Sequence, residues 1–421
     1  MNILIVNTSE RTGGAAVAAN RLMKALNNYG MKAKMLVRDK ESDTLTVVQL
    51  PHSPMKHWHF LWERLVVYCK LHFSKHHLFE IDIANAGTDI TKLREFQEAD
   101  IIHLHWVNQG MLSLNNIRKI LHSGKAVVWT MHDIWPATSI CHVTLNCRSF
   151  TTGCHHCRLL PGGGSNHDLA YSTWQKKQAM VQSGTIFYVA CSRWLESEAK
   201  KSALLTGQKI TSIPNCIDTH IYRKGNKQEA RQRLGLPANQ KLILFASQRV
   251  TNENKGMSYL IEACQQLAQT DGAKPGVVIL GGHAEEVVAQ LPLDAYPLGY
   301  VNDEHRIVDV YNAVDVFVLP SLSENLPNTI MEAMACGVPC VGFRIGGIPE
   351  EIDHQKNGYV AEYRNANDLG HGISWILNEA DYEALSEQAI HKVNRNYSQR
   401  SVASKYIEIY NQALAIKHYK I

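Results

Sequence analysis

Short hydrophobic runs alternate with helical stretches along this chain, and the first repeat of that pattern lies at the N-terminus. Residues 3–6 form an apolar, β-branched run, residues 9–14 a glycine-containing turn, and residues 15–26 place their apolar side chains on related helical faces. An apolar run without alternation is typical of a strand that is covered on both faces, as in parallel sheets. Strand, loop and helix together indicate the first unit of a doubly wound α/β sheet.

Further runs of this kind fall into two series. The first comprises residues 34–37, 100–104, 126–130 and 186–190, and the second residues 242–245, 277–280, 316–319 and 340–343. Because a domain commonly has about 100–200 residues, 421 residues in two series predict two Rossmann-like domains. We expect an N-terminal domain over residues 1–214 and a C-terminal domain over residues 215–397. A last helix is predicted over residues 398–421, with no strand after it.

Composition narrows the class of protein. The chain is 45% hydrophobic and carries a formal net charge of +4, without the dense basic patch that nucleic-acid binding requires. The N-terminus has no signal-peptide pattern, and no run of 18 apolar residues predicts a membrane span. We therefore expect a cytoplasmic protein, with a position at the inner face of the membrane as the alternative. Its ten cysteines are expected to be reduced thiols or metal ligands.

Residues 52–80 depart from this alternation of strands and helices. They form a basic, histidine-rich and aromatic stretch that includes Trp58 and Trp62. The pattern favours an inserted helix whose aromatic side chains pack on the domain. An interfacial membrane helix is the alternative.

The strongest chemical signal is the segment SENLPNTIMEAMACGVP at residues 323–339. Glu324 follows a predicted strand, Pro327 suits a first helical turn, and Glu332 lies within the helix, eight positions after Glu324. Open α/β sheets bind ligands at this edge, where carboxylates can accept hydrogen bonds from sugar hydroxyls and a helix N-terminus can bind phosphate.

This segment closely resembles the fingerprint of the group 1 (family 4) retaining GT-B glycosyltransferases: a glutamate, seven residues, then Glu-Ala-Met-Ala-Xaa-Gly-Xaa-Pro. Further similarity lies in Gly346-Gly347, in Asn357-Gly358 and in the Ile-Pro-Asn at residues 213–215. The resemblance implies a GT-B fold, α/β with two facing Rossmann-like domains. It also implies that the last helix returns to the first domain.

The resemblance also implies roles for residues of the C-terminal domain. Glu324 is expected to contact the donor sugar and Glu332 the nucleotide ribose, while Asn325 and Leu326 present backbone N–H groups to the sugar and diphosphate. A basic pair after the first strand of this domain would hold the diphosphate, and the candidates are Lys255 and Arg249. Their spacing is one residue longer than the commonest one in the family.

In the N-terminal domain, Gly13 and Gly14 follow the first strand and could let the backbone approach a phosphate or an acceptor. His132 matches a family histidine that lines the donor pocket, and Asp133 is a candidate for orienting its imidazole.

Two further histidines, His103 and His105, alternate along a predicted strand and therefore face the same side. We take both, together with Asp133, as candidate acceptor residues. A satisfied core histidine is the structural alternative for each.

A cluster of cysteines and histidines over residues 141–157 begins with Cys141 and His142 and also contains Cys147, Cys154 and Cys157. The spacing of the last two suits a structural zinc ion, and free thiols are the alternative. A similar subgroup of bacterial polysaccharide-assembly transferases also carries such an insertion. Catalysis is expected to need no metal, because group 1 enzymes hold the diphosphate with side chains.

Together these observations predict a glycosyltransferase that moves a hexose-type sugar from a UDP- or GDP-linked donor to a glycan or lipid-linked glycan, with retention of configuration. Peripheral membrane contact is possible. The alternatives are a sugar-nucleotide epimerase on the same fold and a non-catalytic, zinc-stabilised nucleotide-sugar-binding protein.

Overall fold

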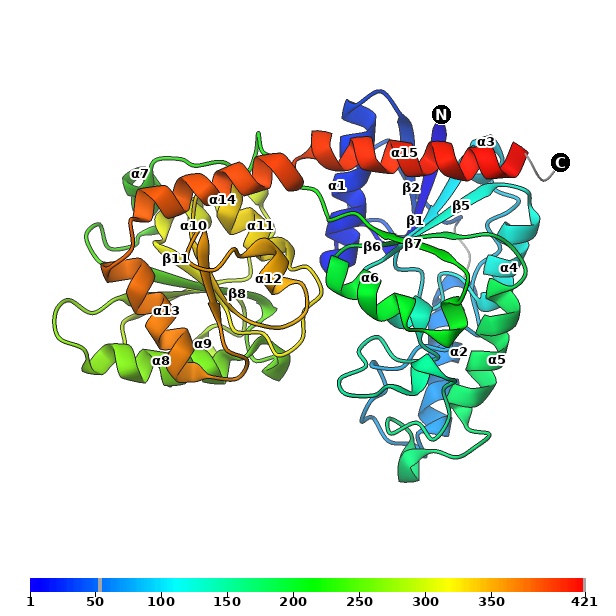
Figure 1. Cartoon of the computed structure of the whole chain (residues 1–421), viewed down its shortest axis with the longest axis horizontal. Helices are drawn as coiled ribbons and strands as arrows, with labels where there is room; N and C mark the ends of the chain where they lie inside the picture. Colours follow the sequence, from blue (N-terminus) through cyan, green and yellow to red (C-terminus); the bar gives the residue numbers. More distant parts are fainter. Residues whose placement is uncertain (52–54, 419–421) are drawn as a thin grey trace. The chain divides into compact units, whose positions relative to one another are not determined.

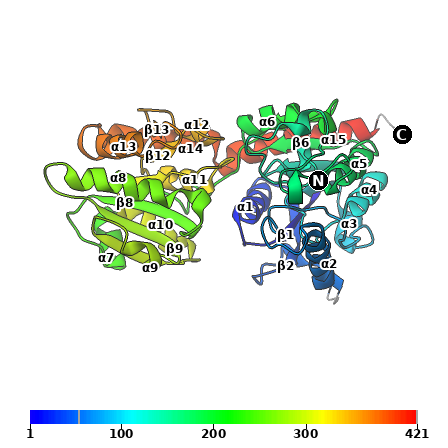
Figure 2. The same ribbon diagram turned by 90° about the horizontal axis from the view of Figure 1, so that it is seen from below.

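The computed structural model describes residues 1–51 and 55–418, and these residues form two compact units. Unit 1 comprises Met1–Cys216 with Val402–Ile421, and unit 2 comprises Ile217–Ser401. Each unit contains one parallel sheet with helices on both faces, as Figures 1 and 2 show for unit 2. The predicted doubly wound α/β architecture is therefore confirmed in both units.

The sheet of unit 1 has the strand order β3-β2-β1-β4-β5-β6-β7, and all its strand pairs are parallel. Its strands are β1 (Asn2–Ser9), β2 (Lys32–Asp39), β3 (Val47–Gln49), β4 (Ile101–Leu104), β5 (Ala126–Met131), β6 (Phe187–Ala190) and β7 (Lys209–Ser212). Its helices are α1 (Gly14–Asn28), α2 (Met55–Lys70), α3 (Arg94–Glu98), α4 (Leu114–His122), α5 (Leu169–Val181) and α6 (Arg193–Lys200).

The sheet of unit 2 has the order β10-β9-β8-β11-β12-β13 and is also parallel throughout. Its strands are β8 (Leu242–Arg249), β9 (Gly276–Gly282), β10 (Ala295–Gly299), β11 (Val316–Leu319), β12 (Cys340–Phe343) and β13 (Gly358–Ala361). Its helices are α7 (Lys227–Leu234), α8 (Met257–Gln269), α9 (Glu285–Val288), α10 (Glu304–Ala313), α11 (Asn328–Ala335), α12 (Ile348–Glu351), α13 (Ala366–Asn378) and α14 (Tyr382–Asn396).

The last helix, α15 (Gln399–His418), begins at the end of unit 2 and then packs on unit 1 (Figure 1). Tyr406 and Tyr410 of this helix are buried in a core cluster with Ile3 and Ile5 of β1. Residues 419–421, which the sequence assigns to the same helix, lie outside the described residues.

The sequence pattern does not predict four strands, β3, β7, β10 and β13, which are the outermost strands of the two sheets. β3, β7 and β10 are short and only partly buried, and β10 contains Pro297, which cannot donate to a neighbouring strand. An edge strand lacks a neighbour on one side, so its sequence needs less hydrophobicity than a central strand.

The predicted helix in the irregular segment is present as α2, but the expectation that its aromatic side chains pack on the domain is wrong for Trp58 and Trp62. These side chains are 56% and 45% exposed. Phe60 is partly buried, with the guanidinium of Arg38 5.6 Å from its ring centre. Residues 52–54 of the predicted segment lie outside the described residues.

Candidate functional site

Unit 2 has one topological switch point, between the neighbouring strands β8 and β11. From β8 the chain continues through β9 and β10 toward one edge, and from β11 it continues through β12 and β13 toward the other. The loops that leave these two strands therefore diverge, which is where open α/β sheets bind ligands. Lys255 lies in the loop after β8 and Glu324 in the loop after β11, so the candidate donor residues lie on the two sides of this point.

The two candidate residues contact each other directly. The Nζ of Lys255 donates a hydrogen bond to Oε1 of Glu324, and the two side chains are 31% and 13% exposed. A partly buried ion pair of this kind combines a fixed cation with a carboxylate that keeps a second oxygen for other partners.

Glycines allow the loops around this pair to approach closely. Gly256 has φ 72°, and a Cβ at this position would lie 1.9 Å from the carbonyl oxygen of Pro320. A Cβ on Gly346, at φ 57°, would lie 1.7 Å from the carbonyl oxygen of Glu324. The loop at residues 320–325 is thus held between two neighbouring loops, and any other residue at either glycine would displace it.

Glu332 lies in α11 and is 8% exposed. Its Oε2 accepts a hydrogen bond of 2.9 Å from the hydroxyl of Tyr311 in α10. Burial, followed by the charge of Glu332, raises the pKa of Tyr311 well above its usual value, so this hydroxyl remains a donor. Sequence reasoning missed Tyr311, since no local motif contains it.

The remaining candidates of unit 2 lie in the same loops. Asn325 and Leu326 precede α11, and the carbonyl of Asn325 accepts a hydrogen bond of 2.7 Å from the backbone N–H of Gly347. Arg249 is exposed at the end of β8, where its Nε donates to Oγ1 of Thr251 at 3.0 Å.

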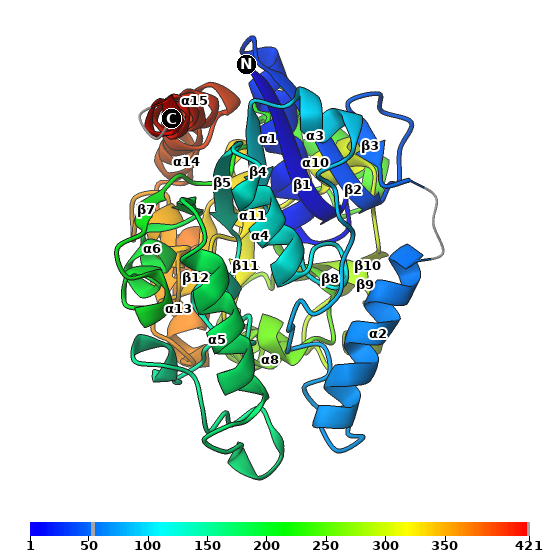
Figure 3. The same cartoon turned by 90° about the vertical axis from the view of Figure 1, so that its right-hand side faces the viewer.

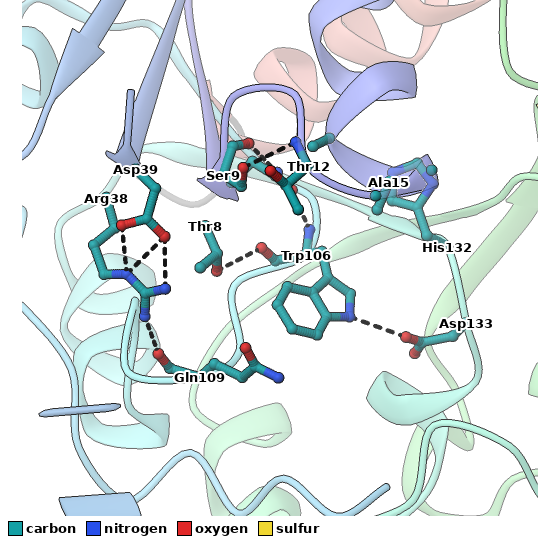
Figure 4. Close-up of a pocket in the computed structure, with 14 residues that line it drawn as sticks. Thr8, Ser9, Thr12, Ala15, Arg38, Asp39, Trp106, Gln109, His132 and Asp133 are labelled. Carbon is teal, nitrogen blue, oxygen red and sulfur yellow. Dashed lines mark hydrogen bonds and ion pairs between the residues drawn. The ribbon is translucent and has the colours of Figure 1, made fainter. Parts of the chain in front are cut away.

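Unit 1 has the corresponding switch point between β1 and β4, and a cavity of about 710 Å³ opens there (Figure 4). Its lining includes Gly13 and Gly14 at the start of α1, Trp106 after β4, and His132 and Asp133 after β5. Sequence reasoning placed four of these residues at strand ends, but it did not single out Trp106.

Three histidines lie in and beneath this cavity. His132 lines the cavity, and its Nε2 is 2.9 Å from Nδ1 of His105, which is 3% exposed. Burial lowers the pKa of His132 to about 4 and that of His103 to about 3, so both imidazoles are neutral near pH 7.

His103 is fully buried and does not contribute to the lining of this cavity. Its Nε2 lies 2.8 Å from the hydroxyl of Thr130, and its Nδ1 lies 2.8 Å from the hydroxyl of Tyr410 in α15. The C-terminal helix α15 therefore contacts His103 directly, through the hydroxyl of Tyr410.

A chain of charged and polar side chains leads from the cavity into unit 1. Oδ2 of Asp133 accepts hydrogen bonds from the indole N–H of Trp106 at 3.1 Å and from Nδ1 of His142 at 2.8 Å. Nε2 of His142 donates in turn to Asp82 at 2.7 Å. Burial opposes the charged form of His142, but the two carboxylates outweigh it and raise the pKa to about 10. His142 is therefore an imidazolium that holds Asp133, and through it the indole, in place.

Sequence reasoning placed His142 only within the cysteine cluster, because no local pattern predicts its contacts with Asp133 and Asp82, which lie nine and 60 residues away. Within residues 1–51 and 55–418 no group of three or more His, Cys, Asp or Glu side chains is arranged to hold a metal ion. Burial, together with neighbouring cysteines, raises the pKa of Cys154 to about 12 and that of Cys157 to about 11, so these thiols are protonated. A bound metal ion deprotonates the thiols that coordinate it, so these pKa values do not test the predicted zinc site at Cys141, Cys147, Cys154 and Cys157, which stays a prediction.

Family models match nearly the whole chain. The model "Glycosyltransferase Family 4" matches residues 12–221, and the model "Glycosyl transferases group 1" matches residues 226–392. The chain belongs to the group 1 glycosyltransferases. The predicted family and its GT-B fold are confirmed by these matches.

Individual relatives of this glycosyltransferase are distant. It is 26% identical over 362 residues to an uncharacterized glycosyltransferase of Methanocaldococcus jannaschii, covering 80% of this chain and 90% of the relative. It is 25% identical over 211 residues to N-acetyl-alpha-D-glucosaminyl L-malate synthase of Bacillus anthracis, covering 49% and 54%. The solved structure of Anabaena HepE in complex with UDP-glucose has the same fold, with a TM-score of 0.63, 16% identity and coverage of 98% and 100%.

Length and hydrophobicity decide whether a helix can span a membrane. In the described part of the chain, no helix combines the length and the hydrophobicity that crossing a bilayer requires.

Proposed function

We propose that this glycosyltransferase transfers a hexose-type sugar from a nucleoside diphosphate donor, linked to uridine or guanosine, to a hydroxyl of a glycan or lipid-linked glycan. The observation that carries the proposal is the Lys255–Glu324 pair at the switch point of unit 2. A departing nucleoside diphosphate develops negative charge, which a fixed, partly buried ammonium group stabilises.

The surrounding residues suit the other parts of such a donor. The carboxylate of Glu324 can accept hydrogen bonds from sugar hydroxyls, and Glu332, oriented by Tyr311, from the hydroxyls of the ribose. The N-terminus of α11 adds backbone N–H groups and partial positive charge for phosphate. The Anabaena protein of the same fold was solved with UDP-glucose, which supports a donor of this chemical class.

The cavity of unit 1 is the proposed acceptor site. A half-buried indole face, here Trp106, suits the apolar face of a sugar ring, and the neutral imidazole of His132 can exchange hydrogen bonds with a hydroxyl group without adding charge. We propose that transfer proceeds with retention by a front-face displacement, in which the leaving phosphate helps to take the acceptor proton. Catalysis then rests on positioning and on charge stabilisation.

Product analysis tests this proposal against its alternatives. Purified protein is incubated with UDP- and GDP-sugars, and a transferase should slowly release nucleoside diphosphate and free sugar. An epimerase would instead accumulate a nucleotide sugar of altered configuration, and a binding protein would change neither. Glu324→Gln should abolish the release while Lys356→Gln, an exposed control in the same unit, retains it. Equal rates in both variants would overturn the assignment.

A further inference from the structure

Helix α2 buries the charged residues Glu63 and Arg64 beside Val67, and it exposes large apolar side chains on another face. Trp58, Leu61, Trp62 and Leu65 are 56%, 56%, 45% and 50% exposed. Their spacing of three, one and three residues places them on one face of the helix. Surface helices of globular proteins show the opposite arrangement, with the apolar stripe against the core.

The buried face of α2 is held by ionic and polar contacts. Glu63 is fully buried, and its Oε1 accepts hydrogen bonds from the backbone N–H groups of Ile83 at 2.9 Å and Ala84 at 2.7 Å. Arg64 is 6% exposed and pairs with Asp82, the carboxylate that also binds His142. These contacts fix the rotation of α2, so the apolar face is presented outward by the fold itself.

The residues after α2 extend this surface. Phe73 and Phe79 are 68% and 63% exposed. The ring of Phe73 lies 5.6 Å from that of Tyr68 in α2, and the guanidinium of Arg64 lies 5.8 Å from the ring centre of Phe79. We call Trp58, Leu61, Trp62, Leu65, Phe73 and Phe79 the α2 patch. It holds six of the twelve large hydrophobic side chains that are exposed in the described part of the chain.

Charge around the α2 patch is basic. Lys70 and Lys75 are exposed, whereas Glu80 is the one exposed carboxylate between residues 57 and 80. A cavity of about 440 Å³ adjoins the end of α2, and its lining includes Lys70, His72 and His167. It also includes Asp168, whose carboxylate caps α5 by accepting from the N–H of Tyr171 at 2.8 Å. The surroundings therefore suit an anionic phosphate group.

We propose that the α2 patch docks unit 1 on the surface of a bilayer that contains anionic lipids. Exposed tryptophans prefer the membrane interface, and an amphipathic helix with lysines beside its apolar face binds there by apolar burial and by attraction to lipid phosphates. Figure 3 shows α2 at the periphery of unit 1, together with the loop that follows it. The inference goes beyond the proposed function, since docking requires neither donor nor acceptor.

The test uses vesicle flotation with the full chain. Vesicles of phosphatidylcholine with phosphatidylglycerol should bind the protein, and binding should weaken with added salt because salt screens the lysines. Trp62→Ser should lower the affinity about tenfold, because it removes a large apolar side chain from the surface that the bilayer would bury. Leu45→Ser is the matched control: Leu45 is 93% exposed in unit 1 but lies outside the α2 patch, and its loss should leave binding unchanged.

Three results would overturn the proposal. The first is that wild type does not bind the phosphatidylcholine–phosphatidylglycerol vesicles, and the second is that a Trp62→Ser/Leu65→Ser variant binds them as well as wild type does. The third is that wild type forms a concentration-dependent dimer that the double substitution disrupts, while neither protein binds the vesicles. The last result would assign the patch to a second copy of the chain. Donor hydrolysis in solution is measured on the same variants and should be unchanged, so that a failure of docking is distinguishable from a failure of the glycosyltransferase assignment.

Discussion

The two sheets share one topology but present different chemistry at their switch points. In unit 2 a lysine and a glutamate meet where the loops diverge. In unit 1 the same position has neutral histidines and an indole, and the nearby carboxylate of Asp133 is compensated from within the unit by His142. A fold thus sets where a site lies, and the loop residues decide which ligand it can take.

The difference fits the donor and acceptor roles that we propose for the two sites. A diphosphate brings charge that an ammonium group can meet, whereas an acceptor hydroxyl is neutral and is better oriented by dipoles and by an aromatic face. Burial by itself disfavours the ionised form of Asp133, but His142 and other hydrogen-bond donors lower its pKa. The negative charge of Asp133 is therefore permanent and already paired with His142.

The largest expected effect is the loss of this internal compensation. His142→Gln should destabilise unit 1 by about 3–5 kcal/mol, because it leaves Asp133 without its cation and Asp82 with Arg64 as its remaining cation. Urea unfolding measures the change. His155→Gln, an exposed histidine in the same loop, is the control and should have little effect.

The difference in stability between wild type and His142→Gln should depend on pH. A histidine whose pKa is about 10 when folded and about 6.5 when unfolded contributes its full stability below pH 6.5 and loses it as the pH rises toward 10. The difference in unfolding free energy between wild type and His142→Gln should therefore shrink from pH 6 to pH 10. A difference that is constant over this range would contradict a charged His142.

The next largest effect should come from removing the positive charge of Lys255 in unit 2. Lys255→Met should lower kcat/KM about 10²–10³-fold, as the loss of a group that stabilises transition-state charge does. Lys255→Arg should recover part of the activity, because it keeps the cation. Steady-state kinetics with a saturating acceptor measures kcat/KM of both variants. A small loss of kcat/KM in Lys255→Met would contradict the view that the site of unit 2, unlike that of unit 1, acts through a cation.

A buried carboxyl group in unit 2 offers a smaller effect. Glu351 of α12 is fully buried, and among the described residues neither of its oxygens has a hydrogen-bond partner. Burial, followed by the charge of Glu324, raises its pKa well above the usual value, so wild type loses stability as the pH rises above about 4.5. Glu351→Gln should gain about 1.4 kcal/mol per pH unit relative to wild type above that value. Thermal unfolding at pH 5 and pH 7 tests this, and an equal difference at both would mean that Glu351 is ionised when folded.

The smallest expected effect concerns Tyr311. Tyr311→Phe removes one hydrogen bond to Glu332 and should weaken donor binding by about 1 kcal/mol, or about fivefold. Titration calorimetry with UDP- or GDP-sugars measures the change, and Tyr300→Phe, whose side chain is exposed in the same unit, serves as the control.

Local patterns determined most of the central strands and the candidate donor residues. Runs such as residues 242–245 and 316–319 are apolar because both faces are covered. Glu324 and Glu332 stand in one local motif and Lys255 in a separate segment, and neither requires long-range information. The edge strands β3, β7 and β10 escaped this reasoning because partial exposure relaxes their composition.

By itself, the sequence determined the two parallel α/β sheets, the family and the residues at the strand ends, because these depend on neighbours along the chain. Only the tertiary structure decided that His142 serves Asp133 rather than the cysteine cluster, that Tyr311 holds Glu332, and that α2 faces outward with its tryptophans. Each of these depends on partners distant in sequence, and the same helical periodicity is compatible with either rotation of α2. The buried contacts of Glu63 and Arg64 select one rotation.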